Sequence, residues 1–179
     1  MLKRDIVNAI SDKLEATILG SAAGSATMPA GIFNGVTAET KDITYKRLVD
    51  METALEEANV AGNKCFIVSP SAKGILKTTA KDALYNVTDG GVHTCVGCAG
   101  CLMEENEVNG YPVYCTSNVT SKGVVMGHFE DFVIGQWGGI DLTVDPYTQA
   151  ANGKVRLVIN AYFDAKPRRT GSFQKAILK

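Results

Sequence analysis

Val155-Arg-Leu-Val-Ile-Asn-Ala-Tyr-Phe-Asp-Ala165 has the most regular pattern in the chain, an alternation of two sets of side chains. One set is apolar and the other is punctuated by polar residues: Val155, Leu157, Ile159, Ala161 and Phe163 against Arg156, Asn160 and Asp164. Alternation with a period of two indicates a β-strand with one buried face. At ~3.3 Å per residue the strand would be about 36 Å long, whereas most strands have about five or six residues.

The same period of two extends upstream over most of the second half of the chain. It predicts strands at Tyr111–Thr116, Val124–His128, Phe132–Gln136 and Ile140–Val144, separated by turns rich in Gly, Asn, Ser and Asp. We interpret Gly135-Gln-Trp-Gly138-Gly139 as a turn between the last two strands. Asp145-Pro146 is interpreted as the start of another turn rather than as a metal ligand.

Helical periodicity dominates the first half. Residues 1–19 predict a helix with an apolar stripe of Leu2, Ile6, Val7, Ile10, Leu14 and Ile18. A second helix is predicted over 42–59, then a buried strand at Cys65–Val68, then a short helix that begins at Ser69-Pro70 and ends near Lys77. The predicted helices come first in the chain and most of the strands come later, which indicates an α+β fold. We expect the long helix and the long strand to form a spine beside a compact lobe. The first helix begins without a cap, so we expect the chain to be part of something longer.

Composition excludes several classes of protein. The chain has 179 residues, 45% of them hydrophobic, and its 18 Lys and Arg against 19 Asp and Glu give a net charge of -1. This length corresponds to one domain or two small ones, and this apolar content excludes intrinsic disorder. Sequence-independent binding to nucleic acid needs clustered positive charge, but the one basic cluster, Lys166-Pro-Arg168-Arg169, is typical of a solvated turn. No apolar run is long enough to predict a membrane helix.

Motifs for catalysis are not found in the sequence. It contains neither a phosphate-binding GxxxxGK[ST] motif nor a GxGxxG motif after a strand. His93 and His128 have no nucleophile elbow near them, and Asp131, Asp141 and Asp145 are scattered at predicted turns. We therefore predict that the chain is not an enzyme and assign no catalytic residue.

His93-Thr-Cys95-Val-Gly-Cys98-Ala-Gly-Cys101 contains a CxxCxxC spacing. Thiolates at this spacing can turn toward one cation, as in zinc and iron–sulfur sites. A fourth ligand would have to be His93, Cys65 or Cys115, brought close by the fold. The alternative is a loop of small residues with no bound ion, and we commit to neither a metal nor a cofactor. Because five cysteines are an odd count and a cytoplasm is reducing, we do not expect a disulfide framework.

Several blocks also resemble one known family. They are Phe66–Lys77, Asn109–Val113, Val133–Tyr147 and Val155–Asp164, together with Met28-Pro-Ala-Gly-Ile32 after the first helix. In this order they are similar to the carboxy-terminal half of the major capsid proteins of tailed bacteriophages, of the Hong Kong 97 type. The resemblance covers nearly the whole chain. The amino-terminal arm and the extended loop of that family have no counterpart, which suggests a form truncated at the amino terminus.

The resemblance implies a division into two domains. Residues 1–35 and 132–166 would belong to a peripheral domain with the spine helix and the long strands. Residues 36–131 and 167–179 would form a compact axial domain, and Phe173–Leu178 would return to its sheet. The Cys95, Cys98 and Cys101 loop would lie in a variable part of the axial domain.

The implied function is that of a structural subunit of a phage or prophage capsid. Its main partner would be itself, in pentamers or hexamers, with other phage structural proteins as further partners. Its location would be the virion, after assembly in the cytoplasm of the bacterial host. We expect self-association through sheet edges and the axial lobe. Two alternatives stay open: a small metal or iron–sulfur protein, and a shell subunit of the same fold in a cellular nanocompartment.

Overall fold

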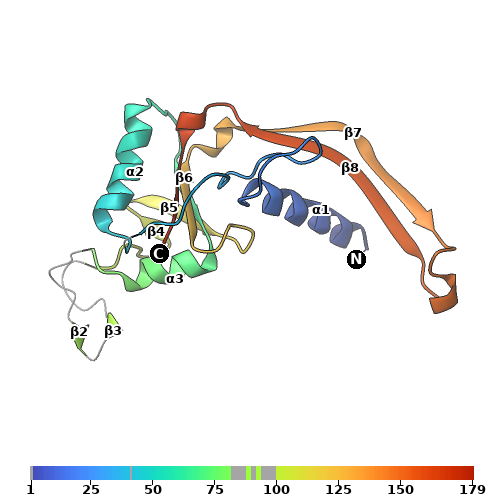
Figure 1. Cartoon of the computed structure of the whole chain (residues 1–179), viewed down its shortest axis with the longest axis horizontal. Coiled ribbons are helices and arrows are strands. Elements are labelled where there is room, and N and C mark those ends of the chain that lie inside the picture. Colours follow the sequence, from blue (N-terminus) through green and yellow to red (C-terminus); the bar gives the residue numbers. More distant parts are fainter. Residues whose placement is uncertain (1, 41, 82–87, 90–91, 94–99) are drawn as a thin grey trace.

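The computed structural model describes residues 2–40, 42–81, 88–89, 92–93 and 100–179. It has two parts, a compact lobe and a long two-stranded ribbon that arches away from the lobe beside the first helix (Figure 1). This is the spine beside a compact lobe that the sequence predicts. How the chain divides into domains at residues 35, 131 and 166 stays a prediction.

The lobe is built on a sheet of five strands in the order β4-β5-β1-β6-β9. β1 pairs in parallel with β5 and antiparallel with β6, and β9 pairs with β6 from Gly123↔Ile177 to Gly127↔Phe173. The carboxy-terminal residues thus return to the lobe sheet, as expected. The strands are β1 (Cys65–Val68), β4 (Glu107–Val108), β5 (Tyr111–Cys115), β6 (Gly123–Gly127) and β9 (Phe173–Ile177).

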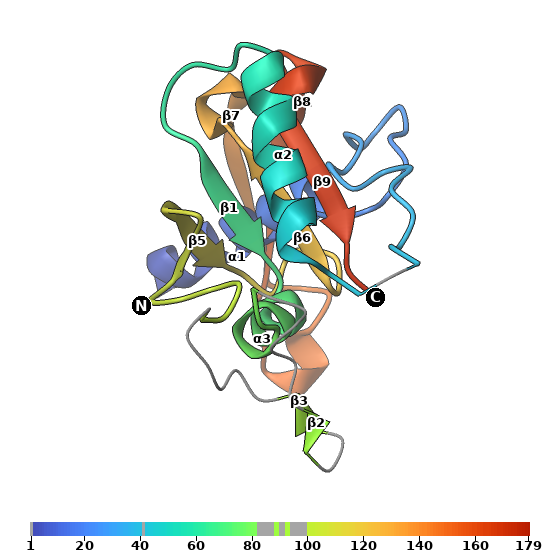
Figure 2. The ribbon, with the colours of Figure 1, turned by 90° about the vertical axis from the view of Figure 1, so that its left-hand side faces the viewer.

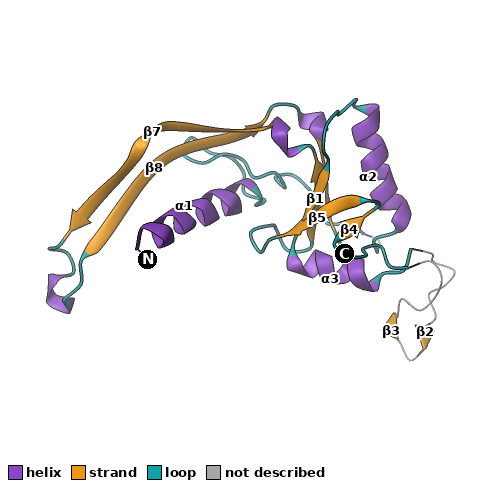
Figure 3. Ribbon diagram, turned by 180° about the vertical axis from the view of Figure 1, so that it is seen from behind, coloured by secondary structure: helices purple, strands orange, loops and turns teal. Residues whose placement is uncertain are grey.

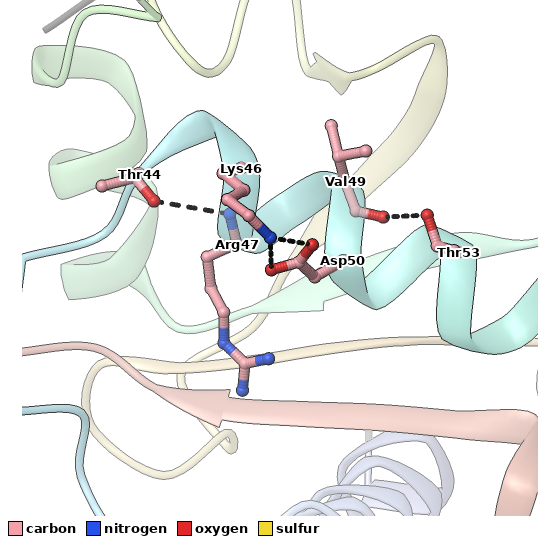
Figure 4. A network of polar contacts seen from close by, with 6 residues as sticks. All are labelled: Thr44, Lys46, Arg47, Val49, Asp50 and Thr53. Atoms are coloured by element: carbon pink, nitrogen blue, oxygen red, sulfur yellow. Dashed lines mark hydrogen bonds and ion pairs between the residues drawn. The ribbon is translucent and has the colours of Figure 1, made fainter.

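Two helices pack on this sheet, α2 (Tyr45–Glu57) and α3 (Pro70–Thr78) (Figure 2). Thr44 caps α2, because its side chain accepts a hydrogen bond from the Arg47 amide (Figure 4). The sequence-predicted cap of α3 is confirmed: Ser69 Oγ accepts from the Ala72 amide at 3.2 Å, and Pro70 occupies the first helical position. An ion pair on the exposed face of α2, Lys46–Asp50 at 2.6 Å, adds little stability at the surface.

The main core lies between these helices and the sheet. Helix α2 contributes three side chains at spacings of three and four, and the sheet and α3 supply further buried members: Leu48, Met51, Leu55, Phe66, Val68, Leu76 and Val124. Burying a Leu or Phe side chain contributes about 1.5–3 kcal/mol. The lobe therefore has a core of its own.

The ribbon consists of β7 (Phe132–Asp145) and β8 (Arg156–Pro167), which pair antiparallel on both sides of one register shift. The register runs from Phe132↔Pro167 to Asp145↔Arg156 and shifts between Trp137 and Asp141. The predicted turn at 135–139 is therefore wrong: Gly138, at φ +72°, lies at a bulge within one long strand. A bulge keeps the strand direction, whereas a turn would reverse it.

Helix α1 (Leu2–Ile18) runs beside the ribbon (Figure 3). Its last turn enters a second hydrophobic cluster between the lobe and the ribbon, formed by Ile18, Leu19, Ile32, Phe33, Val119, Val125, Ala165 and Phe173. The predicted stripe is correct for Ile18, but Val7 is wrong, because its side chain is 57% exposed. The remaining described elements are small: β2 (Thr88–Asp89), β3 (Val92–His93), η2 (Phe129–Asp131), η3 (Ala150–Asn152) and η4 (Thr170–Ser172).

Candidate functional site

Exposed hydrophobic side chains gather on the ribbon. Most of the large ones that the described residues expose lie on β7, β8 or the tip between them: Val133, Ile134, Trp137, Ile140, Leu142, Val144, Tyr147, Val155 and Tyr162. The lobe exposes only Tyr45 and Tyr114 among the described residues. Single exposed hydrophobic residues are ordinary, but a contiguous group marks a surface that another molecule covers.

The two faces of the ribbon differ in composition. Residues directly opposite each other in an antiparallel pair point to the same face, so the register sorts the side chains. The face toward α1, here called the inner face, is apolar except for Gln136 and carries Ile134, Leu142, Val144, Leu157, Ile159, Phe163 and Ala165. The opposite or outer face is mixed and carries Trp137, Asp141, Thr143, Arg156, Asn160, Tyr162, Asp164 and Lys166.

Grooves separate the inner face from α1. One groove of about 590 Å³ is bordered by Ile10 and Leu14 of α1, by Met28, and by Ile159 and Phe163 of β8. Another of about 340 Å³ lies nearer the lobe, among Ile18, Ile67, Phe132 and Ile134. Interiors that are fully formed are close-packed with few voids. The side chains of α1 and the ribbon therefore do not fill the space between them, and part of the apolar surface stays uncovered.

The helix is also too short to cover the ribbon. The 17 residues of α1 span about 26 Å at 1.5 Å per residue, whereas the 14 residues of β7 span about 46 Å at ~3.3 Å per residue. Beyond the helix, Leu142 is 54% exposed, Val144 57% and Val155 58%. An isolated two-stranded hairpin is at best marginally stable in water, and the distal ribbon has no covering element among the described residues.

A polar junction fixes the ribbon to the lobe. The hydroxyl of Ser172, which is fully buried, donates a hydrogen bond of 2.5 Å to the Asp131 carboxylate. The Asp131 carbonyl accepts from the Arg168 amide at 2.7 Å, and the Ser172 carbonyl accepts from the His128 amide at 3.2 Å. Edge-to-face contacts of Phe173 with Phe129 and Phe132 surround this network. The ribbon is therefore held in one direction relative to the lobe.

The tip of the ribbon is organised by Asp145, which starts a turn as the sequence predicts. Its carboxylate accepts from the amides of Tyr147 at 2.9 Å and Thr148 at 3.1 Å, and also from the Thr148 hydroxyl. These bonds, the Thr148 hydroxyl first, hold the pKa of Asp145 below its ordinary value. Tyr147 is 86% exposed at this tip.

The predicted metal ligands are only partly visible. Cys95, Cys98 and the side chain of His93 lie outside the described residues. Cys101 is disulfide-bonded, contrary to the expectation that the cysteines stay reduced, and a disulfide sulfur is not a thiolate ligand. Cys65 and Cys115 are strand residues with free thiols, and burial raises the pKa of Cys65, which disfavours its thiolate. Among the described residues no cluster of His, Cys, Asp or Glu is built to hold a metal. Whether the CxxCxxC loop holds a metal or is an ion-free loop of small residues stays an untested alternative.

The histidine and acidic residues considered for catalysis are not brought together. The ring of His128 packs against Gly62, and its Nδ1 lies 2.9 Å from the Asn63 carbonyl oxygen. Asp131 holds the junction, whereas Asp141 lies within β7 and not at a turn. Sequence reasoning missed that the ribbon has a second open face. The signal was available, because Val133 and Tyr162 place large apolar or aromatic side chains on the face that would be polar in a half-buried strand.

Comparison of the sequence with known proteins finds a matching family and a similar protein. The family model described as "Phage capsid family" matches residues 1–176. A protein named "Major capsid protein", from the Halomonas phage phiHAP-1, is 31% identical over 133 residues. The match covers 74% of this chain but only 20% of that protein.

Solved shell proteins share the fold. The capsid of an empty GTA particle superposes with a TM-score of 0.65 at 16% identity, covering 98% of this chain and 66% of that one. Gordonia phage Cozz gives 0.63 at 16% identity, covering 98% and 62%. The SrpI encapsulin complex from Synechococcus elongatus PCC 7942 gives 0.57 at 11% identity, covering 97% and 63%. The chain thus spans under two thirds of these solved chains. None of its described helices combines the length and the hydropathy that a membrane span requires.

Proposed function

The chain belongs to the phage capsid family, and from this we propose that it is a structural subunit of a phage or prophage shell with no catalytic step. Its partner is a further copy of itself, arranged in pentamers or hexamers, and its location is the virion after assembly in the host cytoplasm. The observation that carries the proposal is the ribbon, which exposes apolar side chains that a monomer leaves in water.

The site of self-association in this proposal differs from the lobe and sheet edges that the sequence suggested. The lobe exposes few large hydrophobic residues, and the bridge from Ala38 to Ile177 covers part of the outer edge of β9. The distal ribbon, by contrast, exposes Leu142 and Val144 on one face of β7 and Val155 just before β8. Burial of such apolar surface is the main driving force of association, at about 25 cal/mol per Å².

The test is the solution mass by light scattering over a concentration series. We expect oligomers for the wild type and a shift toward monomer for the double variant Leu142→Gln, Val144→Gln. The matched control is Tyr114→Gln, because Tyr114 is as exposed, at 60%, but lies on the lobe. Exposed substitutions usually change stability by less than about 0.5 kcal/mol, so both variants should fold.

Two results would contradict the proposal. One is a monomer at every concentration, and the other is an equal loss of mass in the lobe control and the ribbon variant. The nanocompartment alternative is supported by the shared fold with an encapsulin at 11% identity. The family match favours the phage shell instead.

A further inference from the structure

The outer face of the ribbon carries an exposed aromatic pair next to carboxylates. Trp137 and Tyr162 are direct cross-strand neighbours and are 60% and 65% exposed. Asp164 lies opposite Gly135, one position toward the lobe on the same face, and Asp141 lies beyond the bulge toward the tip. We call Trp137, Tyr162, Asp141 and Asp164 the aromatic-acidic platform.

The indole of Trp137 is held beside Asp164. A Cβ atom built on Gly135 would lie only 3.1 Å from Cη2 of Trp137, so the ring lies over Gly135. Because Gly135 pairs with Asp164, the indole ring and Asp164 occupy neighbouring positions on this face. Trp137, Tyr162 and Asp164 also border a groove of about 640 Å³ with the turn at Ser25–Pro29. A cation over an aromatic face and beside a carboxylate is attracted by both groups, and a guanidinium suits such a site best.

The same chain offers a matching basic segment. Lys166, Arg168 and Arg169 are exposed where β8 leaves the ribbon. Among the described residues, no ion pair involves these three side chains, nor Asp141 or Asp164. Arg47, by contrast, is paired with Glu39 at 2.9 Å, and Arg156 lies opposite Asp145. The unpaired charges on the two surfaces are complementary.

Within one molecule, Lys166 lies beside Asp164 on the same face, but the two arginines lie farther from the platform. The Arg168 amide is fixed by its hydrogen bond to the Asp131 carbonyl. Four residues of extended strand separate Arg168 from Asp164, a span of about 13 Å at ~3.3 Å per residue, and the aromatic pair lies farther still. Contact of the arginines with the aromatic pair therefore requires a second copy.

We propose that the aromatic-acidic platform of one subunit binds the basic segment 166–169 of a neighbouring subunit. This inference rests on the proposed function, since it names a second contact between associating copies, in addition to the apolar contact of the distal ribbon. The contact is heterologous: each copy uses its platform on one neighbour and its basic segment on another. Such head-to-tail contacts close into rings when the rotation between copies allows it.

The first test uses the single tryptophan of the chain as the probe. A synthetic peptide, Ala165-Lys-Pro-Arg-Arg-Thr-Gly171, is titrated into the protein while Trp137 fluorescence is recorded. We expect a saturable change for the wild type. Affinity should fall about tenfold or more for a peptide with Gln at both Arg positions, and likewise for the Asp164→Asn protein. Asp12→Asn, at an exposed and unpaired site on α1, is the control.

The second test is complementation between two variants. Trp137→Ala, Asp164→Asn lacks the platform, and Arg168→Gln, Arg169→Gln lacks the basic segment. Each alone should lose higher oligomers, whereas an equimolar mixture should give heterodimers, because one intact platform meets one intact segment. Gly135→Ala should weaken peptide binding by displacing the indole, without removing any charge or ring.

The two proposals fail in different ways. If the wild type associates, but the Arg168→Gln, Arg169→Gln protein associates equally well and the peptide leaves the fluorescence unchanged, this inference is overturned and the proposed function stands. If the wild type is monomeric at every concentration while the peptide binds as described, recognition of the basic segment by the platform is supported, but the proposed self-association fails. Equal binding of the Gln peptide also overturns the inference.

Discussion

At the scale of single residues, Tyr111 shows how one polar contact under α2 depends on pH. Its hydroxyl donates to Glu52 Oε1 at 2.9 Å. Burial first, then the hydrogen bond and the negative charges of Glu52 and Glu56, raises the pKa of Tyr111 from 10.0 to about 12. The folded state thus holds this proton more tightly than the unfolded chain does.

From this we predict that the contribution of Tyr111 to stability is fully present below about pH 10 and is lost as the pH rises toward about 12. Urea unfolding at a series of pH values should show this decline in the wild type. Tyr111→Phe should have a flatter profile over the same interval, and its absorbance titration at 295 nm should lack the highest step. Identical profiles for the two proteins would contradict the assignment.

At the scale of elements, the bulge in β7 depends on the backbone of one glycine. Gly138 has φ +72°, whereas Gly139 has no such constraint, and a Cβ atom at either position would meet nothing within 4 Å. The two positions therefore differ in backbone conformation and not in available space. A left-handed conformation costs a residue with a Cβ atom about 1–2 kcal/mol.

We predict that Gly138→Ala destabilises the pairing of β7 with β8 by about 1 kcal/mol, while Gly139→Ala is neutral or slightly stabilising. Amide hydrogen exchange along the ribbon is the appropriate measurement, because the ribbon lies outside the lobe core. Equal exchange rates in the two variants would show that the bulge does not need its left-handed residue.

At the scale of the whole molecule, two hydrophobic clusters stabilise different parts of the fold. The larger one is the lobe core, and the smaller one joins α1, the lobe and the base of the ribbon around Phe33, which is fully buried. Truncating a buried Phe to Ala typically costs about 3–5 kcal/mol. The part of the molecule that loses stability depends on the cluster to which the residue belongs.

We predict that Phe33→Ala releases α1 and the base of the ribbon while the lobe keeps its structure. Hydrogen exchange should show lost protection in α1 and near Phe132, with α2 and α3, which contribute only to the lobe core, still protected. Leu48→Ala is the comparison, since it removes a fully buried side chain from the lobe core and should lower protection in the lobe sheet. Loss of lobe protection in Phe33→Ala would contradict the independence of the two clusters.

Local sequence patterns alone predicted much of the secondary structure of this molecule. Alternation predicted β8, helical periodicity predicted α1 and α2, and Ser69-Pro70 predicted the start of α3, because each signal acts between residues a few positions apart. Combined in order, the sequence blocks also indicated the phage capsid family.

Only the tertiary structure decided the bulge, the long-range neighbours and the exposed ribbon. These features depend on which residues lie opposite one another and not on neighbours in the chain. A Gly-Gly pair is compatible with a turn or a bulge, and only the pairing with β8 made 138–140 a bulge. In the same way, Trp137 and Asp164 are distant in sequence and become neighbours through the strand register. The exposed ribbon, as the candidate assembly surface, follows from a helix that is shorter than the strands it accompanies.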